Sequence, residues 1–183
     1  MSLVQFRFSG FGGQGVIMMG MILGRAGAIH SNLNATLLQS FGPEARGGAC
    51  SATVLLDTDP IYYPYVVMAD VFVTMSQESF DKYITNLRKD GLLIYEEDLV
   101  TLDKAQEDAK IFSIPATKLA EELGRKMVAN IVMTGFLTAI WDGVSASAMR
   151  TSALEVVPKG TEELNGIAFD KGYAYGLNQK AKG

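Results

Sequence analysis

Cysteine and histidine are almost absent from this sequence, and their scarcity excludes several kinds of site. Among 183 residues there is one cysteine, Cys50, and one histidine, His30. An iron–sulfur cluster needs several cysteine ligands, and a structural zinc site needs about four cysteine or histidine ligands. The chain alone therefore supplies neither. Cys50 lies in a strand-like run and is predicted to be a small core residue. His30 lies near the end of a predicted helix, where its side chain is expected to interact favourably with the helix C-terminus.

Acidic residues are missing from the first 43 positions, since the first one is Glu44. This absence bears on a glycine-rich stretch, residues 9–15, between a strand-like run at 3–8 and a helix-like run at 16–29. The spacing of its glycines fits the dinucleotide-binding pattern, but a nicotinamide site wants an acidic residue about 20 positions later to bind the ribose. No Gly-Lys-Ser/Thr follows the glycines either, so a P-loop is absent. NAD binding is disfavoured.

The glycine-rich stretch has two interpretations that the sequence leaves open. A turn between a strand and a helix directs backbone amides and the helix N-terminus toward a bound anion, which would involve Gly12, Gly13, Gln14 and Gly15. Alternatively, Gly12 and Gly13 only permit a sharp turn, and Gly15 only lets the helix lie close to the sheet.

Strong positive charge and long apolar runs are also lacking. The net charge is −4 and lysine and arginine do not cluster, so no nucleic-acid partner is indicated. The longest apolar stretches, 16–23 and 131–141, are too short or too interrupted to span a bilayer, and no secretory signal is visible. These features predict a cytoplasmic protein with no membrane partner. A hydrophobic fraction of 48% over 183 residues suits one well-packed domain covering residues 1–183.

The pattern of apolar runs predicts a three-layer α/β/α domain with a mostly parallel sheet and C-terminal helices. Further strands are expected at 33–38, 49–57, 71–75, 92–95 and 111–114. Between them, Ser76 is expected to cap a helix that includes Leu87 and ends at Asp90-Gly91. Thr117 is expected to cap a short helix that Gly124 stops. The remaining helices are expected at 128–141, from Ser145 through Leu154, and at 161–177.

Three other features allow both a binding role and a structural role. Arg46, in the glycine-rich loop 41–48, could fork onto a carboxylate or phosphate, or it could pair locally with Glu44 or face solvent. The aromatic connector 61–65 is a partner contact if exposed and core if packed under the sheet. Asn130, Thr134 and Thr138 form one stripe on a buried helix, which either binds a ligand or bonds to backbone.

Several motifs of this sequence, and their order along the chain, resemble those of the gamma subunit of 2-oxoacid:ferredoxin oxidoreductases. This family includes pyruvate and ketoisovalerate enzymes. The most specific motifs are Gly10-Phe11-Gly12-Gly13-Gln14-Gly15 and Phe41-Gly42-Pro43-Glu44-Ala45-Arg46-Gly47-Gly48. Further matches are Met68-Ala69-Asp70, Ile114-Pro115-Ala116-Thr117 and Ala129-Asn130-Ile131-Val132-Met133. The unbroken run from Glu44 to Gly48 looks most like the 2-oxoglutarate type.

The resemblance implies a subunit that is inactive alone and works with alpha, beta and ferredoxin-like subunits. Such complexes convert a 2-oxoacid and coenzyme A (CoA) to acyl-CoA and CO2 and pass electrons to ferredoxin. Thiamine diphosphate, Mg and iron–sulfur clusters are expected in the partner subunits, since this chain has one cysteine and no thiamine diphosphate motif. Gly12, Gly13, Gln14, Gly15, Glu44 and Arg46 are expected near the CoA entry, with no catalytic or metal-binding residue in this chain.

Two alternatives stay open beside this resemblance. One is a stand-alone nucleotide- or CoA-binding α/β module, which the glycine-rich turn favours and the missing acidic residue disfavours. The other is a purely structural scaffold subunit, in which the turn and the loop at 41–48 serve packing and docking only.

Overall fold

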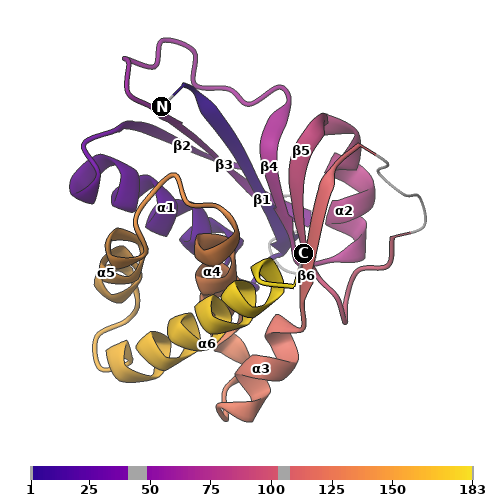
Figure 1. The fold of residues 1–183 in the computed structure, drawn as a ribbon, viewed down its shortest axis with the longest axis vertical. Helices are drawn as coiled ribbons and strands as arrows, with labels where there is room; N and C mark the ends of the chain where they lie inside the picture. Colours follow the sequence, from indigo (N-terminus) through magenta and orange to yellow (C-terminus); the bar gives the residue numbers. More distant parts are fainter. Residues whose placement is uncertain (1, 41–48, 103–107, 183) are drawn as a thin grey trace.

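The computed structural model describes residues 2–40, 49–102 and 108–182, and within them the chain forms a mixed six-stranded sheet flanked by helices (Figure 1). The strands lie in the order β2-β3-β1-β4-β5-β6. Their bounds are β1 Val4–Phe11, β2 Asn34–Ser40, β3 Ala49–Asp57, β4 Ala69–Thr74, β5 Leu87–Glu96 and β6 Lys110–Ile114. The pairs β1–β4, β4–β5 and β5–β6 are parallel, which confirms the mostly parallel sheet.

Strand β3 is the exception, because it pairs antiparallel with both β1 and β2. Only eight residues, 41–48, separate β2 from β3 in the sequence. A parallel pair needs a crossover of about a dozen residues or more, so neighbouring strands with this short connection run antiparallel.

Helices cover both faces of the sheet and confirm the three layers. Figure 1 places α1, α4, α5 and α6 on one side and α2 on the other. Their bounds are α1 Val16–His30, α2 Gln77–Tyr83, α3 Ala116–Glu122, α4 Ala129–Ile140, α5 Ala146–Val156 and α6 Glu162–Lys180. Two short 3-10 turns, η1 Ile84–Asn86 and η2 Lys126–Val128, complete the described elements. Within the described ranges, no helix is long and apolar enough to cross a membrane.

The strand alternation divides the core into two clusters. Phe6, Phe8 and Val73 face the layer that contains α1 and α4, and they belong to the larger cluster. Phe72 and Leu93 point to the opposite face and pack with Phe80 of α2. Alternate residues of β4 therefore serve different layers, as expected for a strand buried on both faces.

Helix α4 is the predicted central buried helix. The hydroxyls of Thr134 and Thr138 donate to the carbonyls of Asn130 and Thr134 at 2.7 and 2.8 Å. The polar stripe therefore bonds largely to its own backbone, as in the structural alternative. Helix α6 crosses α4 at two glycines: a Cβ on Gly135 would collide with the backbone of Phe169, and one on Gly172 with the backbone of Val132.

The prediction of a helix from Ser76 through Leu87 was wrong at its C-terminal end. Ser76 does cap α2, since its side chain accepts a hydrogen bond from the Ser79 amide. The helix ends at Tyr83, however, and Leu87 begins β5 because its side chain belongs to the Phe72 cluster. Asp90-Gly91 lies inside β5, where the register with β4 shifts, and does not form a turn between elements.

Thr117 is not the helix cap that the sequence predicted. It is the second residue of α3, and Pro115 occupies the N-cap position. Gly124 follows the C-cap residue Leu123 with φ +82, so its role as a helix stop is confirmed. Ser145 caps α5 as predicted, because its side chain accepts from the Ala148 amide.

The two scarce residues lie where the sequence placed them. Cys50 is buried in β3 as a free thiol in the main core cluster. His30 is the last residue of α1, and its Nε2 lies 3.2 Å from the Glu155 carboxylate of α5. Arg25, also on α1, pairs with the same carboxylate oxygen at 2.9 Å. Both side chains therefore tie α1 to α5.

Candidate functional site

The glycine-rich stretch forms the predicted turn between β1 and α1. Gly13 has φ +100 and Gly15 has φ +73, a backbone region that only glycine enters at little cost. The Gln14 amide donates to the Phe11 carbonyl at 3.1 Å and closes the turn. Gly15 is the N-cap of α1 and has no side chain to cap the first helical amides. The positive end of the helix dipole therefore faces the surroundings of Gly13 and Gly15.

Gln14 holds this turn against the end of β4. Its Oε1 accepts from the Phe11 amide at 2.7 Å, and its Nε2 donates to the Met75 carbonyl at 2.9 Å. Both ends of the side-chain amide are thus engaged within the protein. In the structure Gln14 positions the glycine turn, and direct ligand binding by Gln14 stays a prediction.

Gly15 has a different neighbour from the one that the sequence suggested. A Cβ at this position would collide with the side chain of Asn130 on α4, whose Nδ2 lies 3.5 Å from the Gly15 carbonyl oxygen. The prediction that Gly15 brings the helix close to the sheet was wrong, because Gly15 lies at the helix end that faces α4. Gly20 and Gly27 make that approach, since a Cβ there would contact Ala52 at 3.0 Å and Leu56 at 2.6 Å.

Two recesses meet at the glycine turn. The larger has a volume of about 420 Å³ and lies between the turn, α4 and the start of α6. The smaller has a volume of about 260 Å³ and lies between the turn, the end of β4 and α3. Gly13 and Met127 line both recesses, and Met127 is 88% exposed. The two recesses are therefore neighbours on one open surface around Gly13.

Among the described residues, each recess has one basic side chain in its wall. Arg125 lines the larger recess, and its guanidinium forms no ion pair with the described residues. Lys126 lines the smaller recess and is 3.7 Å from the Glu121 carboxylate, in a solvent-exposed pair that contributes little. Both cations remain available to an anionic ligand. Neither residue was predicted from the sequence, in which they appear as a basic pair directly after the helix-stopping Gly124.

A buried carboxylate supports the smaller recess from behind. Glu96 is fully buried and accepts from the Thr117 amide at 2.7 Å and from its hydroxyl at 3.0 Å. Burial raises the pKa of the Glu96 carboxyl, and these hydrogen bonds oppose the rise. Thr117 in turn lines the smaller recess. Glu96 therefore fixes the recess wall without facing the recess itself.

The other predicted site residues separate into two groups. Gly12 lies in the turn but lines neither recess. Glu44 and Arg46 lie outside the described residues, so their proximity to the turn stays a prediction. No group of three or more metal-ligating side chains is found in the described part of the chain.

Comparisons with known proteins give one consistent family. The family model described as "Pyruvate ferredoxin/flavodoxin oxidoreductase" matches residues 5–175. The chain is 47% identical over 171 residues to "2-oxoglutarate synthase subunit KorC" of Methanocaldococcus jannaschii, covering 92% of this chain and 91% of that protein. It is 32% identical over 137 residues to "Ketoisovalerate oxidoreductase subunit VorA" of Methanothermobacter marburgensis, covering 75% of this chain and 28% of that protein.

Solved structures share the fold. The gamma subunit of a keto/oxoacid ferredoxin oxidoreductase from Geobacter sulfurreducens superposes with a TM-score of 0.88 at 33% identity, covering 97% of this chain and 98% of that one. A chain of the 2-oxoglutarate:ferredoxin oxidoreductase from Magnetococcus marinus, with 2-oxoglutarate, coenzyme A and succinyl-CoA bound, superposes with a TM-score of 0.86 at 21% identity. This superposition covers 97% of this chain but 32% of the other chain. It shows a similarity of fold.

Proposed function

The chain belongs to the pyruvate ferredoxin/flavodoxin oxidoreductase family, and we propose that it is the gamma subunit of a 2-oxoglutarate:ferredoxin oxidoreductase. The complex would convert 2-oxoglutarate and CoA to succinyl-CoA and CO2 and pass the electrons to ferredoxin. The observation that carries the proposal is the 47% identity to a 2-oxoglutarate synthase subunit over nearly the full length of both proteins. Identity to the ketoisovalerate relative is lower, at 32% over a shorter match.

The redox and decarboxylation chemistry is assigned to the partner subunits. Thiamine diphosphate with Mg, and iron–sulfur clusters, would stabilise the carbanion and transfer the electrons there. Cys50, the one cysteine in the sequence, is buried in β3 and forms part of the core. The contribution of this chain is therefore binding and positioning.

CoA is the ligand that best fits the surface around the glycine turn. Its phosphates are anionic, and Arg125 and Lys126 offer a cation on each side of Gly13. Phosphates are also stabilised at helix N-termini, where α1 begins without a side-chain cap. The apolar walls of the larger recess, which include Met18, Val157 and Leu164, suit the uncharged parts of CoA.

Two alternatives differ from this proposal in measurable ways. A stand-alone nucleotide- or CoA-binding module would function without other subunits, which the similarity to subunits along almost the whole chain disfavours. A scaffold subunit would be needed for assembly, but substitution of Arg125 or Lys126 would leave the CoA dependence of the rate unchanged.

Anaerobic co-expression of the alpha, beta and ferredoxin-like subunits, with and without this chain, tests the proposal. CoA-dependent reduction of an electron acceptor is measured with 2-oxoglutarate, pyruvate and branched-chain 2-oxoacids. We expect this chain to co-purify with the others and 2-oxoglutarate to be the preferred acid. Full activity without this chain would refute the subunit assignment, and preference for pyruvate or a branched-chain acid would refute the substrate assignment.

A further inference from the structure

The connector between β3 and β4 exposes an unusual concentration of aromatic side chains. Tyr62 is 91% exposed, and Tyr63 and Tyr65 are 63% and 59% exposed. The sequence left open whether this connector is exposed or packed under the sheet, and the structure shows that it is exposed. We call Tyr62, Tyr63, Tyr65, Val67 and Met68 the tyrosine surface.

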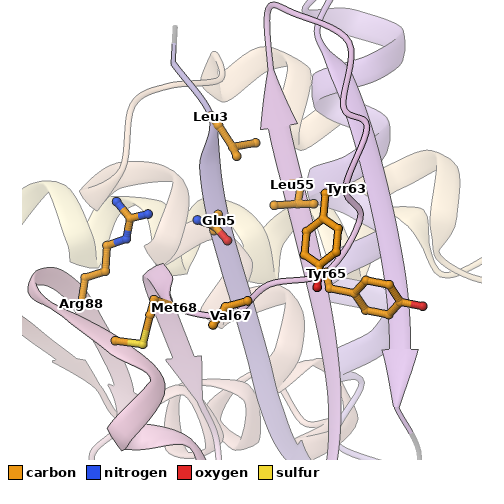
Figure 2. Close-up of a pocket in the computed structure, with 8 residues that line it drawn as sticks. All are labelled: Leu3, Gln5, Leu55, Tyr63, Tyr65, Val67, Met68 and Arg88. Atoms are coloured by element: carbon orange, nitrogen blue, oxygen red, sulfur yellow. The ribbon is translucent and has the colours of Figure 1, made fainter.

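Four residues of the tyrosine surface line a recess of about 310 Å³, namely Tyr63, Tyr65, Val67 and Met68 (Figure 2). Figure 2 shows Tyr63 and Tyr65 at one end, beside Leu55 of β3, and Met68 and Arg88 at the other, with Gln5 of β1 between them. Leu55 is buried and contributes to the recess wall. The surface is therefore concave and largely apolar, like the core of a protein–protein interface.

Contacts with the sheet hold the connector in place. Nη2 of Arg7, on β1, donates to the Val66 carbonyl at 3.3 Å. The same guanidinium lies over the Tyr83 ring, 4.7 Å from its centroid, so it joins the connector to the end of α2. The rings of Tyr63 and Tyr65 are 5.4 Å apart and support each other. A partner that binds this pre-arranged surface loses less entropy than one that must order it.

The charge of the tyrosine surface indicates the chemistry of its partner. Among the described residues that line the recess, Arg88 is the one that is charged, and it is paired with Asp70 at 3.0 Å. The remaining lining residues are apolar or carry neutral hydrogen-bonding groups. Such a surface has no net attraction for nucleic acid or anionic lipid. It complements an apolar protein surface with neutral hydrogen-bonding groups, in which tyrosines commonly contribute much of the binding energy.

The lengths of related proteins indicate which molecule provides that surface. The match covers 28% of the VorA relative, and the shared fold makes up 32% of the Magnetococcus chain. In those proteins the rest of the chain is joined covalently to this unit. The KorC relative, in contrast, is matched over 91% of its length, so a protein of this kind must hold its neighbours by non-covalent contact. A stable contact of this type buries about 1,000 Å² or more.

We propose that the tyrosine surface is the docking site for a neighbouring subunit of the oxidoreductase complex, through an uncharged, largely apolar face of that subunit. This inference rests on the proposed function. The surface lies beside Leu3 and Gln5, at the start of β1, whereas the glycine turn follows the end of β1. Eight strand residues place these ends about 25 Å apart. Docking at the tyrosine surface therefore leaves the glycine turn and its recesses accessible to CoA.

Affinity measurements with the complete chain test the proposal. The purified chain is titrated into the subcomplex obtained by co-expressing the other subunits without it. For the Tyr63→Ser/Tyr65→Ser variant we expect at least about tenfold weaker binding, because loss of interface tyrosines typically costs that much or more. The Ile167→Ser/Leu177→Ser variant, which alters two exposed apolar residues of α6, is the control and should bind like the wild type. Thermal unfolding of each free variant checks that the fold is retained.

The outcomes separate this proposal from the proposed function. If the wild-type chain fails to bind the subcomplex at all, both are overturned. If it binds and the tyrosine variant binds equally well, the proposed function stands and the docking site is wrong. When the tyrosine variant is added to the subcomplex at saturating concentration, the KM for CoA should equal that of the complex with the wild-type chain.

Photo-crosslinking in the intact complex gives a second test that does not depend on variant stability. Tyr62 is replaced by p-benzoylphenylalanine, with Ile167 replaced in the control. We expect light-dependent crosslinking from position 62 to another subunit and none from position 167. Crosslinking from position 62 only to a second copy of this chain would overturn the proposal in favour of self-association.

Discussion

The Glu96 carboxylate on β5 accepts hydrogen bonds from both the amide and the hydroxyl of Thr117, at 2.7 and 3.0 Å, and so caps α3 from a neighbouring strand. Pro115, at the N-cap position, provides no side-chain acceptor for this helix. A helix end needs such acceptors for its first amides. The start of α3 and the recess wall at Thr117 therefore depend on a residue 21 positions earlier in the sequence.

Replacing this cap should destabilise the protein. In Glu96→Ala, the buried Thr117 amide and hydroxyl lose their acceptor, and we expect a loss of about 1–3 kcal/mol in the free energy of unfolding. Glu97→Gln is a matched control, because Glu97 is exposed and should change stability by less than about 0.5 kcal/mol. Urea unfolding of the two variants and the wild type measures both values. Equal stability of Glu96→Ala and wild type would show that α3 does not need this cap.

The free energy of unfolding should depend on pH in the direction that the raised pKa of Glu96 dictates. Burial raises the pKa of the Glu96 carboxyl above its ordinary value of 4.5, so the folded state binds this proton more tightly than the unfolded state. The stabilisation that comes from this tighter proton binding is fully present below the pKa of Glu96 in the unfolded state. It is lost as the pH rises through the pKa of Glu96 in the folded state. Denaturant unfolding from pH 4 upward should show the stability of wild type falling relative to Glu96→Gln. A wild-type advantage that grows with pH would contradict the direction of the shift.

Two glycines of the same segment should respond oppositely to alanine. Gly15→Ala forces a side chain into φ +73 and against Asn130, and we expect a loss of about 2 kcal/mol or more. Gly24→Ala lies inside α1 with no neighbouring atom within 4 Å of the added Cβ, and we expect a gain of about 0.5–1 kcal/mol. Thermal and urea unfolding measure both. If Gly15→Ala were as stable as wild type, the close approach of the turn to α4 would be refuted.

The basic residues beside the glycine turn should affect CoA specifically. Removing the two cations with Arg125→Gln/Lys126→Gln should raise the KM for CoA by about tenfold or more, because hydrogen bonds to charged groups are each worth about 1.5–3 kcal/mol. The KM for 2-oxoglutarate should be unchanged. Lys118→Gln is the control, since Lys118 is exposed on α3 but lines neither recess. Initial rates of the reconstituted complex measure these constants, and a KM for CoA equal to that of Lys118→Gln would remove both residues from the CoA site.

Local patterns were enough to predict the elements around the turn. The alternation of Phe6 and Phe8 with polar residues predicted β1, and the glycines after it predicted the turn into α1. The buried helix α4 was predicted from its nearly continuous apolar run. Each of these signals lies within one segment of the chain.

The features that the sequence did not predict depend on contacts between distant segments. Leu87 matches a helical spacing, but packing against Phe72 draws it into β5. Thr117 has the chemistry of a cap, yet Glu96 performs that role from another strand. Arg125 and Lys126 approach Gly13 only because α3 and η2 lie at the edge of the sheet where β1 ends.

The most direct test of the central claim is add-back of this chain to the complex that lacks it. The purified chain is titrated anaerobically into the partner subunits, and CoA-dependent oxidation of 2-oxoglutarate is followed by reduction of ferredoxin. We expect the activity to be low without the chain, to rise to saturation as the chain is added, and to be much lower with pyruvate as substrate. An activity that is already complete before the chain is added, or a restored activity that prefers pyruvate, would contradict it.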